Sequence, residues 1–199
     1  SVIININPLP VFSISGDTIA CKDERITITA VKDASTVGGL NYEWKDKYGN
    51  VLSDNDELNI VITKDTTLYV KATNAENCSK DTSFHIAMKG IPAIHAVKDT
   101  QNVCKDDPAE LVVTSSMPDV VFSWVDARTG ANIDANDLSN NNTTLRQIVS
   151  TYKEYKATVT KSYPIYGKTK ECFSDTIFKI TPWEKPNIRL NGQIEICQG

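Results

Sequence analysis

Apolar and polar residues alternate with a period of two along much of the chain. The run at 25–30, Arg-Ile-Thr-Ile-Thr-Ala, places its apolar side chains on one face and is rich in β-branched residues, which favour strands. No segment shows the period of 3.6 residues that an amphipathic helix requires. In the first half of the chain we therefore predict strands over about 25–31, 41–47, 50–53, 58–63 and 66–74. Short strands separated by turns indicate an all-β chain built from antiparallel sandwiches.

Three groups of residues occur twice in the same order. Cys-Lys-Asp at 21–23 returns at 104–106, and an aromatic-x-Trp group ends at both Trp44 and Trp124. The group Cys-x-x-Asp-Thr-x-Phe-x-Ile begins at both Cys78 and Cys172. The chain therefore contains two copies of one unit, and the second copy is longer because of extra residues around 161–170.

The repeat predicts the domain organisation. We expect two tandem antiparallel β-sandwiches arranged end to end, one over residues 8–89 and one over residues 90–182. Residues 1–7 match the last strand of a preceding repeat, and residues 183–199 match the first strand of a following one. The chain is thus expected to be a segment of a longer array. The two tryptophans at the third strand are expected to face inward as core anchors.

Composition and charge narrow the possible functions. The chain is 40% hydrophobic and 23% charged, which suits packed cores. A net charge of −4 without a basic block disfavours nucleic-acid binding, and no apolar run is long enough to span a membrane. The chain has only two histidines and no glycine-rich phosphate loop, and its paired carboxylates lie in turns. We therefore predict no enzyme activity and no catalytic, cofactor-binding or metal site.

Acidic and amide-rich loops lie at 53–57, 134–137 and 140–142. Calcium requires six to eight converging oxygens, and neither acidic stretch has the spacing of an EF-hand loop. Solvated hairpin loops account for these segments, and calcium binding is kept as an alternative.

The repeated groups, preceded by a proline and an apolar strand, resemble the tandem immunoglobulin-like (PKD-like) repeats of large Bacteroidota cell-surface proteins. Such repeats occur in SprB-type gliding-motility adhesins and in other proteins exported by type IX secretion. The sequence departs from these families at the first cysteine, where only Cys197-Gln198-Gly199 keeps their frequent Cys-x-Gly. The resemblance implies O-glycosylation at Thr18 and Thr176, each within Asp-Thr-Ile, although both also suit the start of a strand.

The resemblance implies a stalk or spacer of a secreted surface adhesin that serves gliding motility or attachment. Its partners would be neighbouring repeats of the same chain, together with surface glycans or proteins. One alternative is a glycan- or protein-binding module that uses Tyr163 and Tyr166 in the extra segment of the second repeat. The other is the stalk of a secreted enzyme.

Five cysteines in a chain without zinc-ligand spacing favour disulfides and an extracellular, oxidising location. One alternative is a bridge within each repeat, Cys21 to Cys78 and Cys104 to Cys172. The strand count favours another, because five antiparallel strands between Cys21 and Cys78 place them at opposite ends of a sandwich. A bridge between repeats, Cys21 to Cys172, would then form and leave the other cysteines, Cys197 included, to pair outside this segment. The intra-repeat pairing would return if the short strand at 50–53 did not form.

Overall fold

The computed structural model describes residues 6–96, 100–165, 167–189 and 191–192. It divides into two compact units, unit 1 with residues 1–91 and 161–172, and unit 2 with residues 92–160 and 173–199. Apart from one short 3-10 helix, η1 (Ala135–Asp137), every regular element in the described part is a strand. The predicted all-β class with immunoglobulin-like sandwiches is confirmed.

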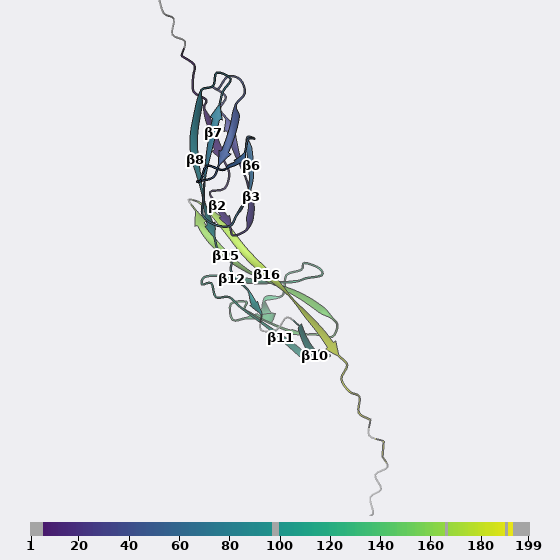
Figure 1. The fold of residues 1–199 in the computed structure, drawn as a ribbon. Helices are drawn as coiled ribbons and strands as arrows, with labels where there is room; N and C mark the ends of the chain where they lie inside the picture. Colours follow the sequence, from purple (N-terminus) through teal and green to yellow (C-terminus); the bar gives the residue numbers. More distant parts are fainter. Residues whose placement is uncertain (1–5, 97–99, 166, 190, 193–199) are drawn as a thin grey trace, which may run out of the picture. The chain divides into compact units, whose positions relative to one another are not determined.

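Unit 1 contains two sheets in which most neighbouring strands are antiparallel (Figure 1). One sheet has the order β1-β3-β6, and the other has the order β2-β8-β7-β4-β5. The only parallel pair of this unit among the described strands joins β2 to β8, the long last strand. The strands are β1 (Phe12–Ser15), β2 (Ile19–Cys21), β3 (Glu24–Lys32), β4 (Asn41–Lys45), β5 (Val51–Ser53), β6 (Glu57–Ile62), β7 (Thr66–Thr73) and β8 (Ser79–Lys89).

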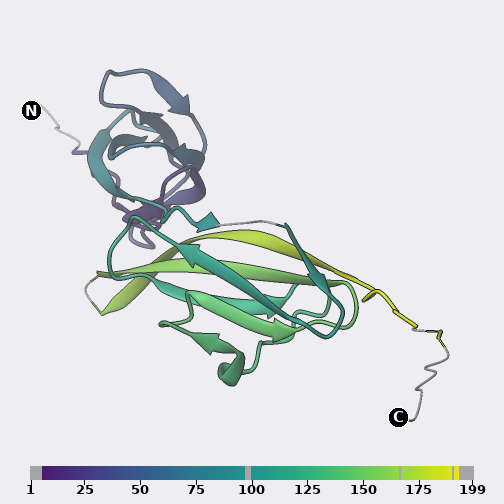
Figure 2. The same cartoon turned by 90° about the horizontal axis from the view of Figure 1, so that it is seen from below.

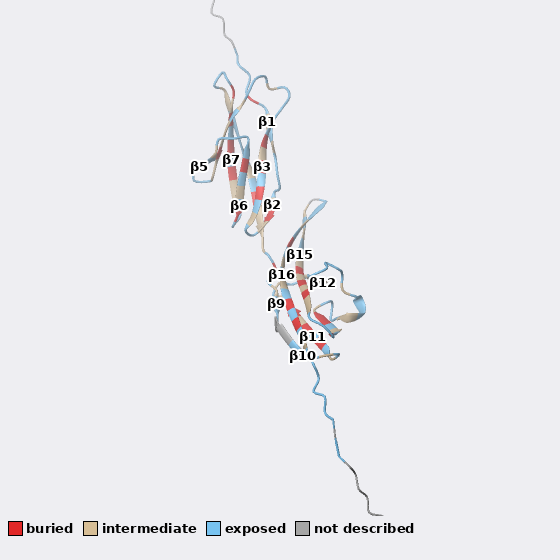
Figure 3. Ribbon diagram, turned by 90° about the vertical axis from the view of Figure 1, so that its right-hand side faces the viewer, coloured by how far each residue is buried: buried red, intermediate tan, exposed pale blue. Residues whose placement is uncertain are grey.

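Alternation of side chains builds the core of unit 1. Along β3, buried Ile26, Ile28 and Ala30 alternate with more exposed residues, as the red and lighter positions in Figure 3 show. Trp44 on β4 is fully buried in the same cluster. Because successive residues of a strand point to opposite faces, the period-two pattern alone specifies which side chains enter the core.

Unit 2 repeats this plan with two four-stranded sheets, ordered β10-β16-β15-β12 and β13-β14-β11-β9. Its core contains Trp124, which packs against Phe178 with the ring centroids 5.4 Å apart. A parallel pair again joins an early strand, β10, to the long last strand, β16. The strands are β9 (His95–Ala96), β10 (Thr100–Cys104), β11 (Pro108–Thr114), β12 (Val121–Asp126), β13 (Leu138–Ser139), β14 (Thr144–Ile148), β15 (Lys153–Ile165) and β16 (Lys168–Trp183).

The extra residues of the second repeat lengthen its last hairpin. β15 and β16 have 13 and 16 residues, whereas the equivalent β7 and β8 have 8 and 11. Figure 2 shows β15 and β16 as the long green-to-yellow neighbours of one sheet. The tip of this hairpin, residues 161–172, groups with unit 1 rather than with the rest of the expected domain at 90–182. We call residues 161–172 the docked tip.

The expected terminal strands fall largely outside the described residues. Residues 1–5 and 193–199 lie outside the described residues. Among the described residues, 6–7, 184–189 and 191–192 lie in no strand. The terminal strands expected from the repeat at 1–7 and 183–199 therefore stay predictions.

Candidate functional site: the bridge between Cys21 and Cys172

The strand register places Cys21 and Cys78 at opposite ends of unit 1. Cys21 on β2 is the partner of Lys89, the last residue of β8, whereas Cys78 directly precedes the first residue of β8. β8 has 11 residues, and a rise of roughly 3.4 Å per residue puts about 35 Å between its ends. Bridged Cα atoms lie within about 7 Å of each other. A Cys21–Cys78 bridge is therefore incompatible with this fold.

Cys21 instead forms a disulfide with Cys172 of the docked tip. Their Cα atoms are 5.6 Å apart, and 151 positions separate them in the sequence. Cys172 is buried, with 1% of its surface exposed. The bridge joins the two sequence repeats, which is the pairing that the strand count favoured. β5, the short strand on which that argument depended, is present.

A half-buried ion pair lies beside the disulfide. Lys170 Nζ of the docked tip is 2.6 Å from Glu24 Oε1, with 20% and 31% of the two side chains exposed. The other carboxylate oxygen of Glu24 accepts a hydrogen bond from the amide of Cys21 at 2.7 Å. Glu24 therefore fixes the backbone at one cysteine while it binds the segment that carries the other. Sequence analysis did not single out either charged residue.

Tyr163 makes the second polar contact of the docked tip. Its hydroxyl donates to the carbonyl of Gly90 at 2.9 Å, and Lys89 Nζ lies 5.7 Å from its ring centroid. Tyr163, which the alternative of a glycan- or protein-binding module would use, is thus engaged within unit 1. Tyr166, the other residue of that expectation, lies outside the described residues.

The amide-rich loops bind the core tryptophans. Trp44 Nε1 donates to the carbonyl of Asn55 at 2.9 Å, and Trp124 Nε1 donates to the carbonyl of Asn142 at 2.7 Å. A buried indole N–H needs such a partner. These loops therefore have a structural role that their composition did not reveal, because the acceptors are backbone atoms.

The acidic residues of the same loops take part in local turns. Asp134 Oδ1 accepts from the backbone N and the Nδ2 of Asn136 at 2.8 and 2.9 Å. Among the described residues, no group of three or more His, Cys, Asp or Glu side chains could hold a metal ion.

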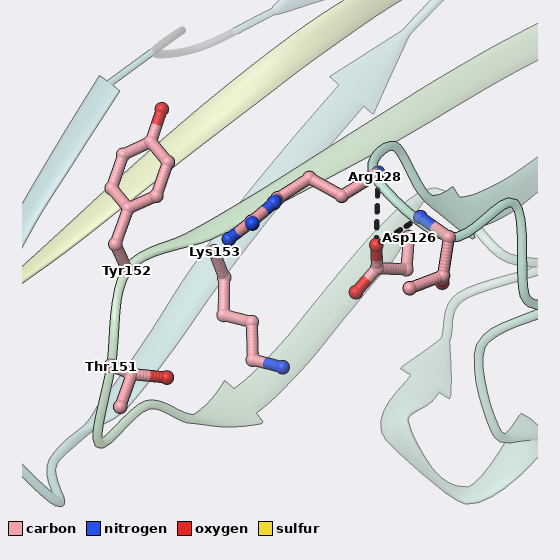
Figure 4. A pocket seen from close by; sticks show the side chains of 6 residues that line it. Asp126, Arg128, Thr151, Tyr152 and Lys153 are labelled. Carbon is pink, nitrogen blue, oxygen red and sulfur yellow. Dashed lines mark hydrogen bonds between the residues drawn. The ribbon is translucent and has the colours of Figure 1, made fainter.

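An aspartate turn follows the tryptophan strand of each unit. In unit 2 it borders an open hollow of about 270 Å³, lined by Asp126, Arg128, Thr129, Thr151, Tyr152 and Lys153. Asp126 Oδ1 accepts hydrogen bonds from the backbone amides of Arg128 and Thr129, each at 2.9 Å (Figure 4). The bond from Thr129 and then that from Arg128 lower the pKa of Asp126. The carboxylate that faces this hollow is therefore held by its own turn.

The other residues that the sequence analysis singled out, among those described, are exposed or half-buried. Thr18 is exposed in the turn before β2, and Thr176 is half-buried on β16. Cys78 is half-buried and Cys104 is exposed, and both are free thiols. Cys197 lies outside the described residues.

No protein-family model and no curated protein matches the chain. Among solved structures, the fibronectin(III)-like modules of Clostridium thermocellum CbhA are similar with 12% identity and a TM-score of 0.41, covering 90% of this chain and 100% of that one. The insect immune protein hemolin aligns with 14% identity and a TM-score of 0.39, over 88% of this chain and 47% of that one. Murine CEACAM1b aligns with 13% identity and a TM-score of 0.33, over 84% and 100%.

These neighbours are immunoglobulin-like or fibronectin-III-like domains. The strand order and the buried tryptophan of each unit independently identify the sandwich. The disulfide is typical of an extracellular domain. The described part of the chain contains no helix with the length and hydrophobicity to cross a membrane.

Proposed function

We propose that this chain is a stalk or spacer segment of a large secreted surface adhesin, of the kind that Bacteroidota use for gliding motility or attachment. The observation that carries the proposal is the disulfide between the two sequence repeats, Cys21 to Cys172. A spacer must transmit force along its length, and a covalent bond between repeats transmits force without depending on packing.

The position of the bridge protects most of the chain from load. Tension that enters at one end of the polypeptide and leaves at the other passes from Cys21 through the disulfide to Cys172. Residues 22–171 then form a closed covalent loop that carries no direct tension. This loop includes both core tryptophans and thirteen complete strands of the described part, β3 to β15. The arrangement favours a load-bearing role over a role that needs the hairpin tip for ligands, because Tyr163 is engaged with Gly90.

The proposal is tested on cells that display the parent protein with and without residues 10–185. This deletion removes two whole repeat lengths, because Pro10 and Pro186 hold the same position in the repeat. We expect the purified shortened protein to keep its ligand binding, whereas cells that display it attach less well under flow. Unchanged attachment would contradict a spacer role.

A parallel measurement distinguishes the spacer from a binding module. Beads coated with the isolated 199-residue chain should adhere to target cells and glycan surfaces no better than beads coated with an unrelated sandwich domain. Specific adhesion of the isolated chain would favour the binding module.

A further inference from the structure

The strand that carries the first cysteine lies beside the same residue position in both units. Cys21 is the register partner of Lys89, and Cys104 is the register partner of Trp183. In both units the amide of the residue after the cysteine donates to the carbonyl of that partner, at 2.8 and 2.7 Å. The backbone around Cys104 is therefore built like the backbone around Cys21.

Of these two cysteines, only Cys21 is bonded to a hairpin tip. Cys21 is bonded to Cys172, and Lys89 lies against the ring of Tyr163 in the same docked tip. In unit 2, Cys104 is an exposed thiol and Trp183 has 61% of its surface exposed. In unit 2, the free thiol of Cys104 and the exposed indole of Trp183 therefore hold the positions that contact the docked tip in unit 1.

Cys78, the second cysteine of repeat one, is a free thiol that lies beside an equivalent residue of the chain. Its Sγ lies 3.9 Å from the carbonyl oxygen of Asn7. Asn7, Lys89 and Trp183 are the same position of the repeat, because each stands three residues before the proline that opens the next copy. The second cysteine of a repeat and the first cysteine of the repeat before it therefore lie beside the same residue.

A polar contact of the hairpin tips supports this equivalence. Asn74, in the tip between β7 and β8, donates from Nδ2 to the carbonyl of Pro8 at 3.0 Å. Tyr163, in the docked tip, donates to the carbonyl of Gly90 at 2.9 Å. Pro8 and Gly90 also share one repeat position, two residues before the proline. The tip of repeat one thus holds the incoming chain as the docked tip does.

We propose that Cys104 is the covalent docking site for the hairpin tip of a following repeat, and that Cys78 is the matching group that bonds to a preceding repeat. The occupant is a repeat of this same kind, whose second cysteine reaches Cys104 as Cys172 reaches Cys21. The inference rests on the proposed function in one respect, since it takes the chain as part of a repeat array.

Formation of the bond requires an oxidant. The two thiols lose two protons and two electrons to form one disulfide, and a small-molecule disulfide such as oxidised glutathione is reduced to two thiols. One thiolate first attacks the small disulfide and releases one thiol, and the second protein thiolate then displaces the other.

The test uses two copies of the chain in one polypeptide, residues 1–185 followed by residues 10–199. This junction keeps the repeat in register, so that repeat one of the second copy follows repeat two of the first. After refolding in a glutathione redox buffer, peptide mapping without reduction should recover Cys104 of the first copy linked to Cys78 of the second. Each copy should also retain its Cys21–Cys172 peptide.

The matched control replaces Cys78 by Ala in the second copy alone. Cys104 of the first copy should then stay a free thiol, while both Cys21–Cys172 bridges form as before. A free Cys104 in the first copy of the unaltered tandem, or that Cys104 linked to any cysteine other than Cys78 of the second copy, overturns the inference. Cys104 of the second copy has no repeat after it and is expected to stay a free thiol. These outcomes concern only the pairing, so they leave the cell-attachment test of the proposed function unaffected.

Discussion

Removing the bridge should destabilise the chain by an amount that follows from the length of its loop. The disulfide closes a loop between positions 151 residues apart. Chain-entropy theory assigns to a loop of this length a stabilisation of about 5 kcal/mol at 25 °C, because the bridge restricts the unfolded chain. The double variant Cys21→Ala and Cys172→Ala should therefore lose up to about 5 kcal/mol of the summed free energy of unfolding of the two units.

The assay is urea denaturation at equilibrium, followed by circular dichroism and tryptophan fluorescence. Both probes are needed because two units need not unfold in one transition. The control variant replaces the two free thiols, Cys78 and Cys104, by Ala and keeps the bridge. We expect the control to differ from the unaltered chain by less than about 1 kcal/mol. If the double variant were as stable as this control, the bridge would not constrain the unfolded chain and the reasoning would fail.

Three further predictions concern the cores, the docked tip and the aspartate turns. Trp44→Ala should cost about 3–5 kcal/mol in urea denaturation because it leaves a cavity, whereas the same change at exposed Tyr48 should have little effect; equal losses would contradict the core assignment. Lys170→Met should speed the reduction of Cys21–Cys172 by dithiothreitol, measured by thiol titration, and exposed Lys168→Met should not; equal rates would show that the ion pair does not hold the tip. The Asn50 side chain foremost, together with backbone amides, lowers the pKa of Asp46, so its turn should stabilise the fold above about pH 4 and lose that effect as pH falls through the lowered value. The difference in urea midpoint between the unaltered chain and Asp46→Asn should then shrink on acidification, and a difference independent of pH would contradict the assignment.

The longer strands of unit 1, such as β3, β6 and β7, were predictable because buried residues alternate with exposed ones along them. The predicted strands match all five strands between Cys21 and Cys78 within a few residues, including the short β5 (Val51–Ser53), which has no buried residue. Because the number of strands is odd, the prediction placed Cys21 and Cys78 at opposite ends of the sandwich. Local pattern was sufficient for this step, since it needs only the number of strands and their reversal of direction.

The docked tip was not predictable in the same way. The repeat comparison found extra residues around 161–170, but their interaction with unit 1 depends on contacts between distant parts of the chain. Glu24 and Lys170 are 146 positions apart, and neither belongs to a motif. The hydrogen-bond partners of the tryptophans were not predictable for another reason. Asn55 and Asn142 accept through their backbone carbonyls, which no residue type reveals, and they follow their tryptophans by different numbers of residues, 11 and 18.

Force spectroscopy on the single chain, held at its two ends, tests the central claim most directly. With the bridge intact, the loop between Cys21 and Cys172 stays out of the path of the force. Its 151 positions correspond to roughly 500–540 Å of extended chain at about 3.3–3.6 Å per residue. We predict that full unfolding of the oxidised chain gains less contour length than unfolding of the Cys21→Ala and Cys172→Ala variant, by about this amount. Equal contour lengths for the two proteins would contradict a load-bearing bridge between the repeats.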